Sequence, residues 1–163
     1  MIKIIIIVGD PNSINSELIF KSWKNLDFKT RKKIILIGNY DLINEQKQKL
    51  KFNINLSKIK NIEASTNINT LKILDFPLRY KNCFNVSKKE ASKYVVGCLN
   101  YAHDLCKKNK INGFINCPID KNLIKKKGIH GVTEFLGKKQ LSAKFSEVMF
   151  LYNKKLSVVP ITT

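Results

Sequence analysis

The stretch IKIIIIVGDPNS, residues 2–13, decides the fold class. Residues 2–8 form a nearly continuous run of β-branched side chains, which is typical of a strand buried on both faces of a parallel sheet. The turn at residues 9–13 ends this strand, and a helical pattern follows. One face of that helix is expected to hold Ile14, Leu18, Ile19, Ser22 and Trp23.

The same strand–turn–helix order recurs along the chain. Short buried strands are expected at residues 34–37 and 111–116, and helices at about residues 40–50 and 87–108. The longer helix starts with SKKE, whose spacing is that of a capping box. Repeated units of this kind predict an α/β fold with a mainly parallel sheet and flanking helices.

The other segments are less regular. Residues 53–85 carry short apolar alternations, which we interpret as short strands and loops, with an antiparallel arrangement as one option. Short helices are expected at residues 120–127, ended by Gly128, and at 133–139. Two final strands, at 148–152 and 156–161, are expected to be joined by a tight polar turn, and the second is expected to be a central strand of the sheet.

Length and composition describe one ordinary globular domain. The chain has 163 residues, of which 44% are hydrophobic and 26% charged, so a core can form without disulfides or metals. Collagen-like and largely disordered classes are excluded, because the chain holds only 7 glycines and 4 prolines among frequent apolar runs.

The net charge of +18 arises from 30 basic residues, of which only Arg31 and Arg79 are arginine. Nucleic-acid binders concentrate basic residues in a patch and often use arginine, whereas the lysines here are spread along the chain. Lysine, asparagine and isoleucine share A- and T-rich codons, so we attribute the charge mainly to nucleotide composition. Binding of polyanions and general attraction of phosphorylated small molecules are the alternatives.

The four cysteines, at positions 83, 98, 106 and 117, have no zinc-site spacing and are expected to be reduced thiols. Residues 2–8 are too short to span a membrane, and no small-residue cleavage site follows them. These features favour a cytoplasmic protein without a membrane partner.

Ligands of parallel sheets bind beyond the carboxyl ends of the strands. Four segments are candidates on this basis: the turn at residues 9–13 with Asp10, the segment NCPIDK at residues 116–121, the segment GVTE at residues 131–134 after His130, and the terminal Thr162-Thr163. The first three have a simpler structural interpretation, since Asp10 and Asp120 can cap local turns and Thr133 can cap a helix.

Lys121 is the candidate for neutralising a phosphate or a developing oxyanion. Its alternative role is that of one more solvated lysine. His130 is a candidate base or metal ligand. Without a second His or Cys nearby, a solvated loop position is the favoured interpretation of His130.

Taken in order, these segments resemble the 4-hydroxythreonine-4-phosphate dehydrogenase family of pyridoxal phosphate biosynthesis. The family's GDPxGIGPE-type loop appears here as GDPNSINSE at residues 9–17. Its T-x-P-x-x-K segment appears as NCPIDK, and its G-H-T-E-[FY]-L segment as GVTEFL at residues 131–136. Its T-T-H strand end appears as Thr162-Thr163, and the histidine would be the next residue.

The resemblance implies the N-terminal portion, residues 1–163, of a two-domain enzyme with the isocitrate/isopropylmalate dehydrogenase-like fold. Such enzymes are homodimers that oxidise the free hydroxyl of 4-phosphooxy-L-threonine with NAD and a divalent metal held by histidines. It assigns substrate contacts to Thr133, Val132 and Lys121, with Asp10, Asn116, Asp120 and His130 as further loop contacts. It places no metal ligand within residues 1–163, so this chain alone is expected to be inactive.

The main departure is Val132, which stands where the family has a histidine. Ser13, Asn15 and Ser16 also replace two glycines and a proline of the first loop. A non-catalytic protein that binds a phosphorylated metabolite or a partner is therefore the second hypothesis. A lysine-rich nucleic-acid-binding module is the third, and steep salt dependence of binding would favour it.

Overall fold

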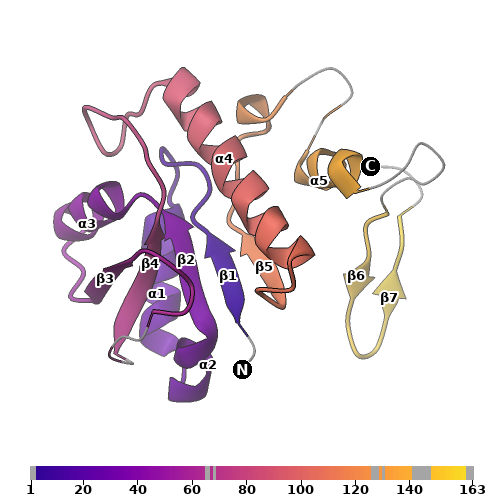
Figure 1. The fold of residues 1–163 in the computed structure, drawn as a ribbon, viewed down its shortest axis with the longest axis horizontal. Coiled ribbons are helices and arrows are strands. Elements are labelled where there is room, and N and C mark those ends of the chain that lie inside the picture. The colour runs from indigo at the N-terminus through magenta and orange to yellow at the C-terminus, as the bar shows by residue number, and fades with distance from the viewer. Residues whose placement is uncertain are drawn as a thin grey trace. The chain divides into compact units, whose positions relative to one another are not determined.

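Five parallel strands form the sheet around which residues 1–123 are built (Figure 1). The computed structural model describes residues 3–64, 67, 69–125, 129, 131–140 and 148–160. Its spatial strand order is β3-β4-β2-β1-β5. The strands are β1 (Ile4–Ile7), β2 (Ile34–Gly38), β3 (Asn55–Ile59), β4 (Thr70–Asp75) and β5 (Gly113–Asn116). The expected α/β class with a parallel sheet is confirmed.

The centre of the sheet is made of isoleucine and leucine because β1 and β2 pair in parallel along their whole length. Ile5 lies opposite Ile35 and Ile7 opposite Ile37, and all four side chains are at most 1% exposed. Leu36 is also fully buried. Burying each such side chain contributes about 1.5–3 kcal/mol, so this pair of strands anchors the unit.

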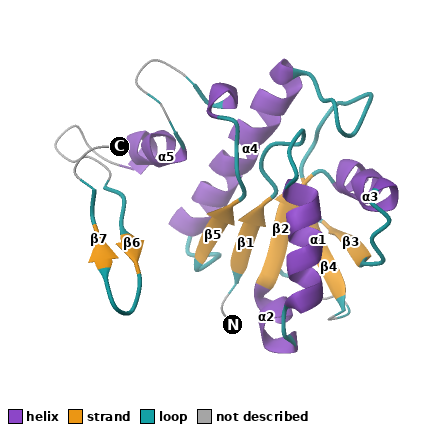
Figure 2. Ribbon diagram, turned by 180° about the vertical axis from the view of Figure 1, so that it is seen from behind, coloured by secondary structure: helices purple, strands orange, loops and turns teal. Residues whose placement is uncertain are grey.

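Helices cover both faces of the sheet. Helix α4 (Lys88–Lys107) lies on one face and α1 (Asn15–Asn25) on the other (Figures 1 and 2). The chain first steps from β1 to β2 and later crosses to β5 on the opposite side of β1. Because crossovers in parallel sheets are right-handed, these two opposite steps place their helices on opposite faces.

The expected capping of the long helix is confirmed, and two aromatic residues are buried. The Ser87 hydroxyl accepts a hydrogen bond from the Glu90 amide at 3.4 Å. Trp23 and Tyr94 are 4% and 2% exposed, so they are core residues. His103, in the same helix, is only 9% exposed.

The predicted face of α1 is buried at Ile19 and Trp23 but not at its other positions. Ile14 and Leu18 are 65% and 43% exposed, whereas Asn15 and Ser16 are buried. Hydrogen bonds set the rotation of α1 about its own axis. The Asn15 amide donates to two strand-end carbonyls, and the Ser16 hydroxyl donates to the Gln46 side chain. Polar side chains with buried partners therefore take the inward positions that the apolar spacing had assigned to Ile14 and Leu18.

The antiparallel option for residues 53–85 was also wrong. β3 pairs with β4 in parallel, and β4 in turn pairs with β2 in parallel. Leu71 and Ile73 of β4 are fully buried, which fixes the register of this strand between its two neighbours.

Two further helices complete this unit. The expected polar helix is α3 (Tyr40–Lys49), and the Asn39 side chain caps it by accepting a hydrogen bond from the Leu42 amide. A short helix, α2 (Phe28–Lys33), was not predicted. The sequence signal for α2 was Asp27. The Asp27 carboxylate accepts hydrogen bonds from the Thr30 amide and the Thr30 hydroxyl, and these bonds lower the pKa of the carboxyl group.

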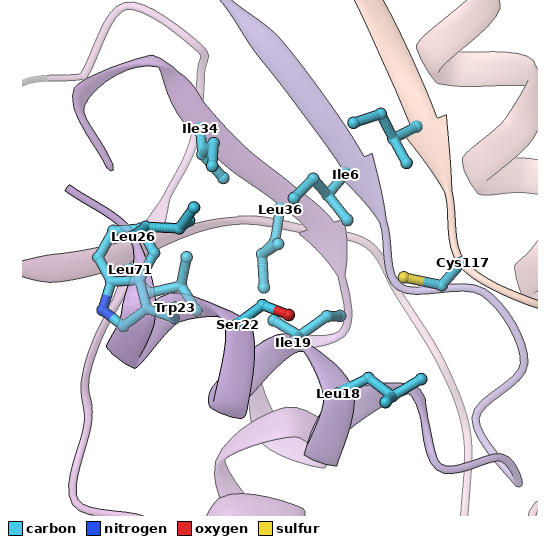
Figure 3. Close-up of a pocket in the computed structure, with 11 residues that line it drawn as sticks. Ile6, Leu18, Ile19, Ser22, Trp23, Leu26, Ile34, Leu36, Leu71 and Cys117 are labelled. Carbon is cyan, nitrogen blue, oxygen red and sulfur yellow. The ribbon is translucent and has the colours of Figure 1, made fainter. Parts of the chain in front are cut away.

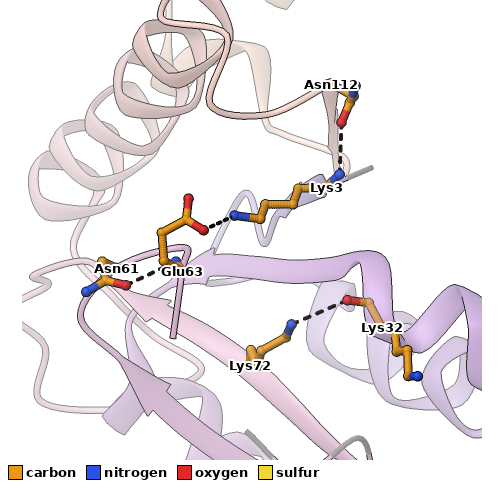
Figure 4. Close-up of polar contacts among 6 residues, drawn as sticks. All are labelled: Lys3, Lys32, Asn61, Glu63, Lys72 and Asn112. Atoms are coloured by element: carbon orange, nitrogen blue, oxygen red, sulfur yellow. Dashed lines mark hydrogen bonds and ion pairs between the residues drawn. The ribbon is translucent and has the colours of Figure 1, made fainter. Parts of the chain in front are cut away.

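At the amino end of the sheet, polar side chains connect segments that are distant in the sequence (Figure 4). The Lys3 amide donates to the Asn112 side chain at 2.9 Å, and the Lys3 ammonium pairs with Glu63. Lys72 donates to the Lys32 carbonyl at 3.4 Å. Partial burial lowers the pKa of Lys72, and the nearby charge of Lys3 adds to this effect.

The helix expected at residues 120–127 is, in the described part of the chain, only a 3-10 turn, η1 (Lys121–Leu123). The Asp120 carboxylate accepts hydrogen bonds from the backbone amide and the side-chain amide of Asn122. These bonds favour a tight turn over a longer helix. Gly128, expected to end that helix, lies outside the described residues.

Residues 124–163 form a second unit, described here by itself. Helix α5 (Val132–Gln140) matches the expected helix. Strands β6 (Leu151–Tyr152) and β7 (Ser157–Val158) form an antiparallel hairpin around the predicted turn. The last strand is therefore not a central strand, and its described residues are exposed. In neither unit is a described helix long and apolar enough to cross a bilayer.

We expect Tyr94→Phe to lower the free energy of unfolding by about 1–2 kcal/mol, because it leaves a buried donor without a partner. The Tyr94 hydroxyl accepts a hydrogen bond from the Asn39 amide at 2.9 Å. Urea unfolding measures the change. Tyr101→Phe is the matched control, since Tyr101 is 40% exposed, and an equal loss in both variants would contradict the assignment.

Candidate functional site

The ends of β1 and β5 are joined by the side chain of Asn15, the first residue of α1. Its amide nitrogen donates to the carbonyls of Val8 and Pro118, each at 2.8 Å. Asn15 is 1% exposed. One buried side chain thus brings together two of the predicted segments, residues 9–13 and 116–121, which we call the strand-end site.

Gly9 lets these two loops approach each other. Its φ is +79°, and a Cβ at this position would lie 2.9 Å from both the Pro118 carbonyl oxygen and the Asn15 amide nitrogen. A side chain here would therefore collide with the backbone of the other loop. The glycine is needed for backbone conformation and for space.

The first loop is held on its other side by two polar side chains. Asn12 mimics a strand partner of Val86: it donates to the Val86 carbonyl at 2.9 Å and accepts from the Val86 amide at 2.7 Å. The buried Gln46 donates to the carbonyls of Pro11 and Cys83 at 3.0 and 2.6 Å. The loop is therefore fixed to the segment before α4 and to α3.

The acidic residues of the strand-end site have local roles. The Asp10 carboxylate accepts from the Asn12 amide at 2.9 Å, and the Asp10 carbonyl accepts from the Ser13 hydroxyl at 2.7 Å. Asp120 holds the η1 turn in the same manner through Asn122. The structural interpretation of both residues is thus supported by their hydrogen bonds, and a ligand role for them stays a prediction.

Lys121 and Asn116 are exposed at the carboxyl end of β5. The Asn116 amide makes only a long contact of 3.4 Å with the Cys117 carbonyl, so its side chain is largely available. Within the described part of the chain, no ion pair engages the Lys121 ammonium. A cation and an amide at a strand end form a suitable arrangement for an anionic group.

Between these residues, Cys117 turns toward an apolar cavity (Figure 3). Burial raises the pKa of its thiol to about 11. The thiol is therefore neutral at physiological pH and is a poor nucleophile. All four cysteines are free thiols, as expected.

The third predicted segment belongs to the second unit. Val132 and Thr133 form the first turn of α5, and both are half-buried. Gly131 allows the Glu134 carboxylate to lie close to the backbone, since a Cβ there would be 2.9 Å from its oxygen. His130 and Thr162-Thr163 lie outside the described residues.

The described residues do not provide a metal centre. No group of three His, Cys, Asp or Glu side chains in this part of the chain is placed to hold a metal ion. His103 is buried in α4, away from the strand ends. We therefore assign no metal-dependent step to these residues.

Sequence reasoning missed the residues that assemble the strand-end site. Asn15 and Gln46 are buried polar residues within helices, and their partners are backbone carbonyls far away in the sequence. The only available signal was a polar residue on an otherwise apolar helical face. That signal does not identify a partner, because the partner is brought near by the sheet.

Comparison with known proteins now bears on this geometry. Residues 30–163 match the family model described as "Pyridoxal phosphate biosynthetic protein PdxA". This chain belongs to the PdxA family. The match includes all of the second unit and most of the sheet.

Two curated PdxA relatives are named 4-hydroxythreonine-4-phosphate dehydrogenase. The one from Sulfurihydrogenibium sp. (strain YO3AOP1) is 29% identical over 167 residues, which is 100% of this chain and 50% of the relative. The one from Aquifex aeolicus (strain VF5) is 30% identical and covers 99% and 49%. The chain thus spans about half the length of the PdxA relatives it matches.

Solved structures of PdxA proteins share the fold. A putative 4-hydroxythreonine-4-phosphate dehydrogenase from Salmonella typhimurium aligns with a TM-score of 0.79 at 21% identity, covering 98% of this chain and 50% of its own. The dehydrogenase from Burkholderia phymatum aligns at 0.77 and 18% identity, covering 98% and 49%. At these identities the likeness establishes the fold alone.

Gly9→Ala is expected to lower the free energy of unfolding of this PdxA chain by about 1–3 kcal/mol, because alanine disfavours φ of +79° and its Cβ collides with Pro118. Gly113→Ala is the matched control, since a Cβ there has no atom within 4 Å. Urea unfolding compares the two. Equal effects would show that the crowding at Gly9 is unimportant.

The Cys117 thiol should alkylate slowly and gain about tenfold in rate per pH unit between pH 8 and 10, because its pKa of about 11 keeps the thiolate scarce. Iodoacetamide labelling followed by peptide mass spectrometry measures the rate. The urea-unfolded chain is the control. A plateau near pH 9 in the folded chain would contradict the burial argument.

Proposed function

We propose that this chain forms the substrate-binding part of an NAD-dependent 4-hydroxythreonine-4-phosphate dehydrogenase of pyridoxal phosphate biosynthesis. The observation that carries the proposal is the match of residues 30–163 to the PdxA family, together with the strand-end site that Asn15 assembles. The reaction removes hydride from the carbon that bears the free hydroxyl of 4-phosphooxy-L-threonine, C3, and leaves a ketone there.

The phosphate of this substrate would be bound at the strand-end site. Lys121 supplies a positive charge, and the Asn116 amide supplies a neutral donor beside it. The loop at residues 9–13 leads into the N-terminus of α1, where backbone amides favour an anion. The net charge of +18 adds a long-range attraction for phosphorylated molecules.

Thr133 is proposed to donate its hydroxyl to the substrate, from the first turn of α5. Val132, which occupies the family's histidine position, offers no hydrogen bond and contributes only apolar contact. His130 lies two residues earlier and is proposed as a further loop contact. The full-length enzyme would obtain its divalent metal and most of its NAD-binding groups from the half that this chain does not match.

Two further properties belong to the proposal. A homodimer and a cytoplasmic location are both inferred from the family resemblance, and the free thiols agree with a reducing compartment. One observation favours a second function: Val132 removes a hydrogen-bonding group from the site. In that case the chain binds a phosphorylated metabolite without turning it over.

Calorimetric titration with 4-phosphooxy-L-threonine tests the substrate assignment. Lys121→Ala is expected to weaken binding about tenfold or more, since a hydrogen bond to a charged group contributes about 1.5–3 kcal/mol. Lys107→Ala, at the far end of α4, is the matched control for loss of net charge. Equal weakening in both variants would assign the effect to net charge instead of to the site.

Absorbance at 340 nm in the same samples, with NAD and Mg²⁺ added, tests catalysis. Residues 1–163 by themselves are expected to produce no NADH, because they match only about half the length of the relatives. NADH formation by the chain alone would overturn that part of the proposal. NADH formation by a fusion of this chain to the other half of a relative would exclude the non-catalytic alternative.

A further inference from the structure

A polar pocket lies at the amino edge of the sheet, on the side of β3 and β4. Helix α2 leads directly into β2, and β4 runs parallel to β2, so the end of α1, helix α2 and the starts of β3 and β4 share this edge (Figure 2). The volume of the pocket is about 280 Å³. We call it the amino-edge pocket, and the residues that line it include Trp23, Lys24, Arg31, Asn53, Asn55 and Asn69.

The two cations of the amino-edge pocket have no acidic partner in the described part of the chain. None of the described lining residues is acidic, and none of the ion pairs found there includes Lys24 or Arg31. Aromatic rings orient both cations instead. The Lys24 ammonium lies 5.1 Å from the centre of the Phe52 ring, and the Arg31 guanidinium lies 5.2 Å from that of Trp23. A ring orients a cation without cancelling its charge, so the pocket keeps two positive charges.

Arg31 is the residue that indicates a ligand. Its Nη2 donates to the Lys24 carbonyl at 3.1 Å, which holds the guanidinium in place. Its Nε is buried and has no hydrogen-bond partner among the described residues. Buried N–H groups of folded proteins almost always have a partner, either in the protein or in a bound molecule. A fixed guanidinium with an unused donor is suited to binding an oxyanion.

Three asparagine side chains add neutral polar groups to the pocket. Asn55 is the first residue of β3, Asn53 lies two residues before it, and Asn69 directly precedes β4. A side-chain amide both donates and accepts hydrogen bonds, so it can bind the hydroxyl groups of a small polar molecule. The pocket therefore combines a cationic part with a neutral polar part.

We propose that the amino-edge pocket binds a phosphorylated small molecule, at a site separate from that of the substrate. A phosphoryl group carries a charge of about −1.5 to −2 at pH 7, which Arg31 and Lys24 together balance. The Arg31 Nε–H is the donor to one phosphate oxygen. Pockets for drug-sized ligands measure about 300–1,000 Å³, so this one takes a small metabolite whose hydroxyl groups contact the asparagines.

The amino-edge pocket and the strand-end site lie at opposite edges of the sheet. Asn55 begins β3, whereas the strand-end site follows the carboxyl ends of β1 and β5. The strands β1 and β4 are 4 and 6 residues long. At about 3.3 Å per residue, the two edges are about 13–20 Å apart. A small ligand in one site therefore does not contact the other, and the inference does not rest on the proposed function.

Titration of the ¹⁵N-labelled chain with inorganic phosphate, followed by nuclear magnetic resonance, tests the inference. The chain has two arginines and one tryptophan, so each arginine Nε–H signal and the indole signal can be assigned. We expect the Arg31 Nε–H and Trp23 indole signals to shift together and to saturate, while the Arg79 signal stays in place. Sodium chloride at equal ionic strength is the control for screening. A shift that does not saturate, or an equal shift with chloride, would overturn the inference and leave Arg31 with only a packing role against Trp23.

Arg31→Gln is expected to weaken phosphate binding at least tenfold, measured at the Trp23 indole signal, because hydrogen bonds from a guanidinium to a charged oxygen are lost. Arg79→Gln is the matched control, since it removes the same charge from an exposed position outside the pocket. Circular dichroism checks that the variants fold. Lys24→Gln, with Lys29→Gln on α2 as its control, repeats the comparison if Arg31→Gln unfolds the chain. Equal weakening in a variant and its control would contradict the assignment.

Two further titrations separate the amino-edge pocket from other modes of binding. Lys121→Ala is expected to leave the phosphate response of Trp23 unchanged, and loss of that response would move the effect to the strand-end site. A single-stranded oligonucleotide that shifts the Arg31 signal at far lower concentration than phosphate, with steep salt dependence, would make this edge a polyanion-binding surface instead. A saturating phosphate response in a chain that does not bind 4-phosphooxy-L-threonine would support the pocket and refute the substrate assignment.

Discussion

The arrangement of the site depends on one buried amide. Asn15 donates to the Val8 and Pro118 carbonyls and so ties the end of β1 to the end of β5. These strands are neighbours in the sheet but are more than one hundred residues apart in sequence. Gly9 leaves the space that this bridge needs, and its positive φ turns the chain toward α1. If the bridge were lost, the buried Val8 carbonyl and the part-buried Pro118 carbonyl would lose this hydrogen-bond partner.

Around this bridge, polar side chains set the path of the backbone and apolar ones supply the stabilising burial. Asn12 and Gln46 fix the first loop to the segments that follow β4 and β2. The isoleucine-rich strands β1 and β2 provide the rigid support beneath it. The loops can therefore be exposed to a ligand and still be held in one conformation. This combination is what a site that recognises a phosphorylated substrate requires.

The two faces of the sheet are covered to different extents. α4 lies on one face of β1, whereas on the opposite side Ile115 of β5 is 57% exposed and Leu18 of α1 is 43% exposed. The strand-end site follows directly on β5, so its loop begins where the burial of the sheet decreases. Its backbone is therefore held mainly by hydrogen bonds from Asn15, with little help from apolar packing at the end of β5.

The sequence by itself determined the α/β class, the parallel character of β1 and β2, the capped start of α4 and the family, because hydrophobic period, turn residues and local caps act over a few residues. Only the tertiary structure decided which face of α1 is buried, that β3 and β4 pair in parallel, and that Asn15 joins two loops. Those outcomes depend on partners from distant parts of the chain, such as Pro118 and Gln46. A local sequence pattern shows that a polar residue is present, but the packing of the sheet determines which carbonyl group accepts its hydrogen bond.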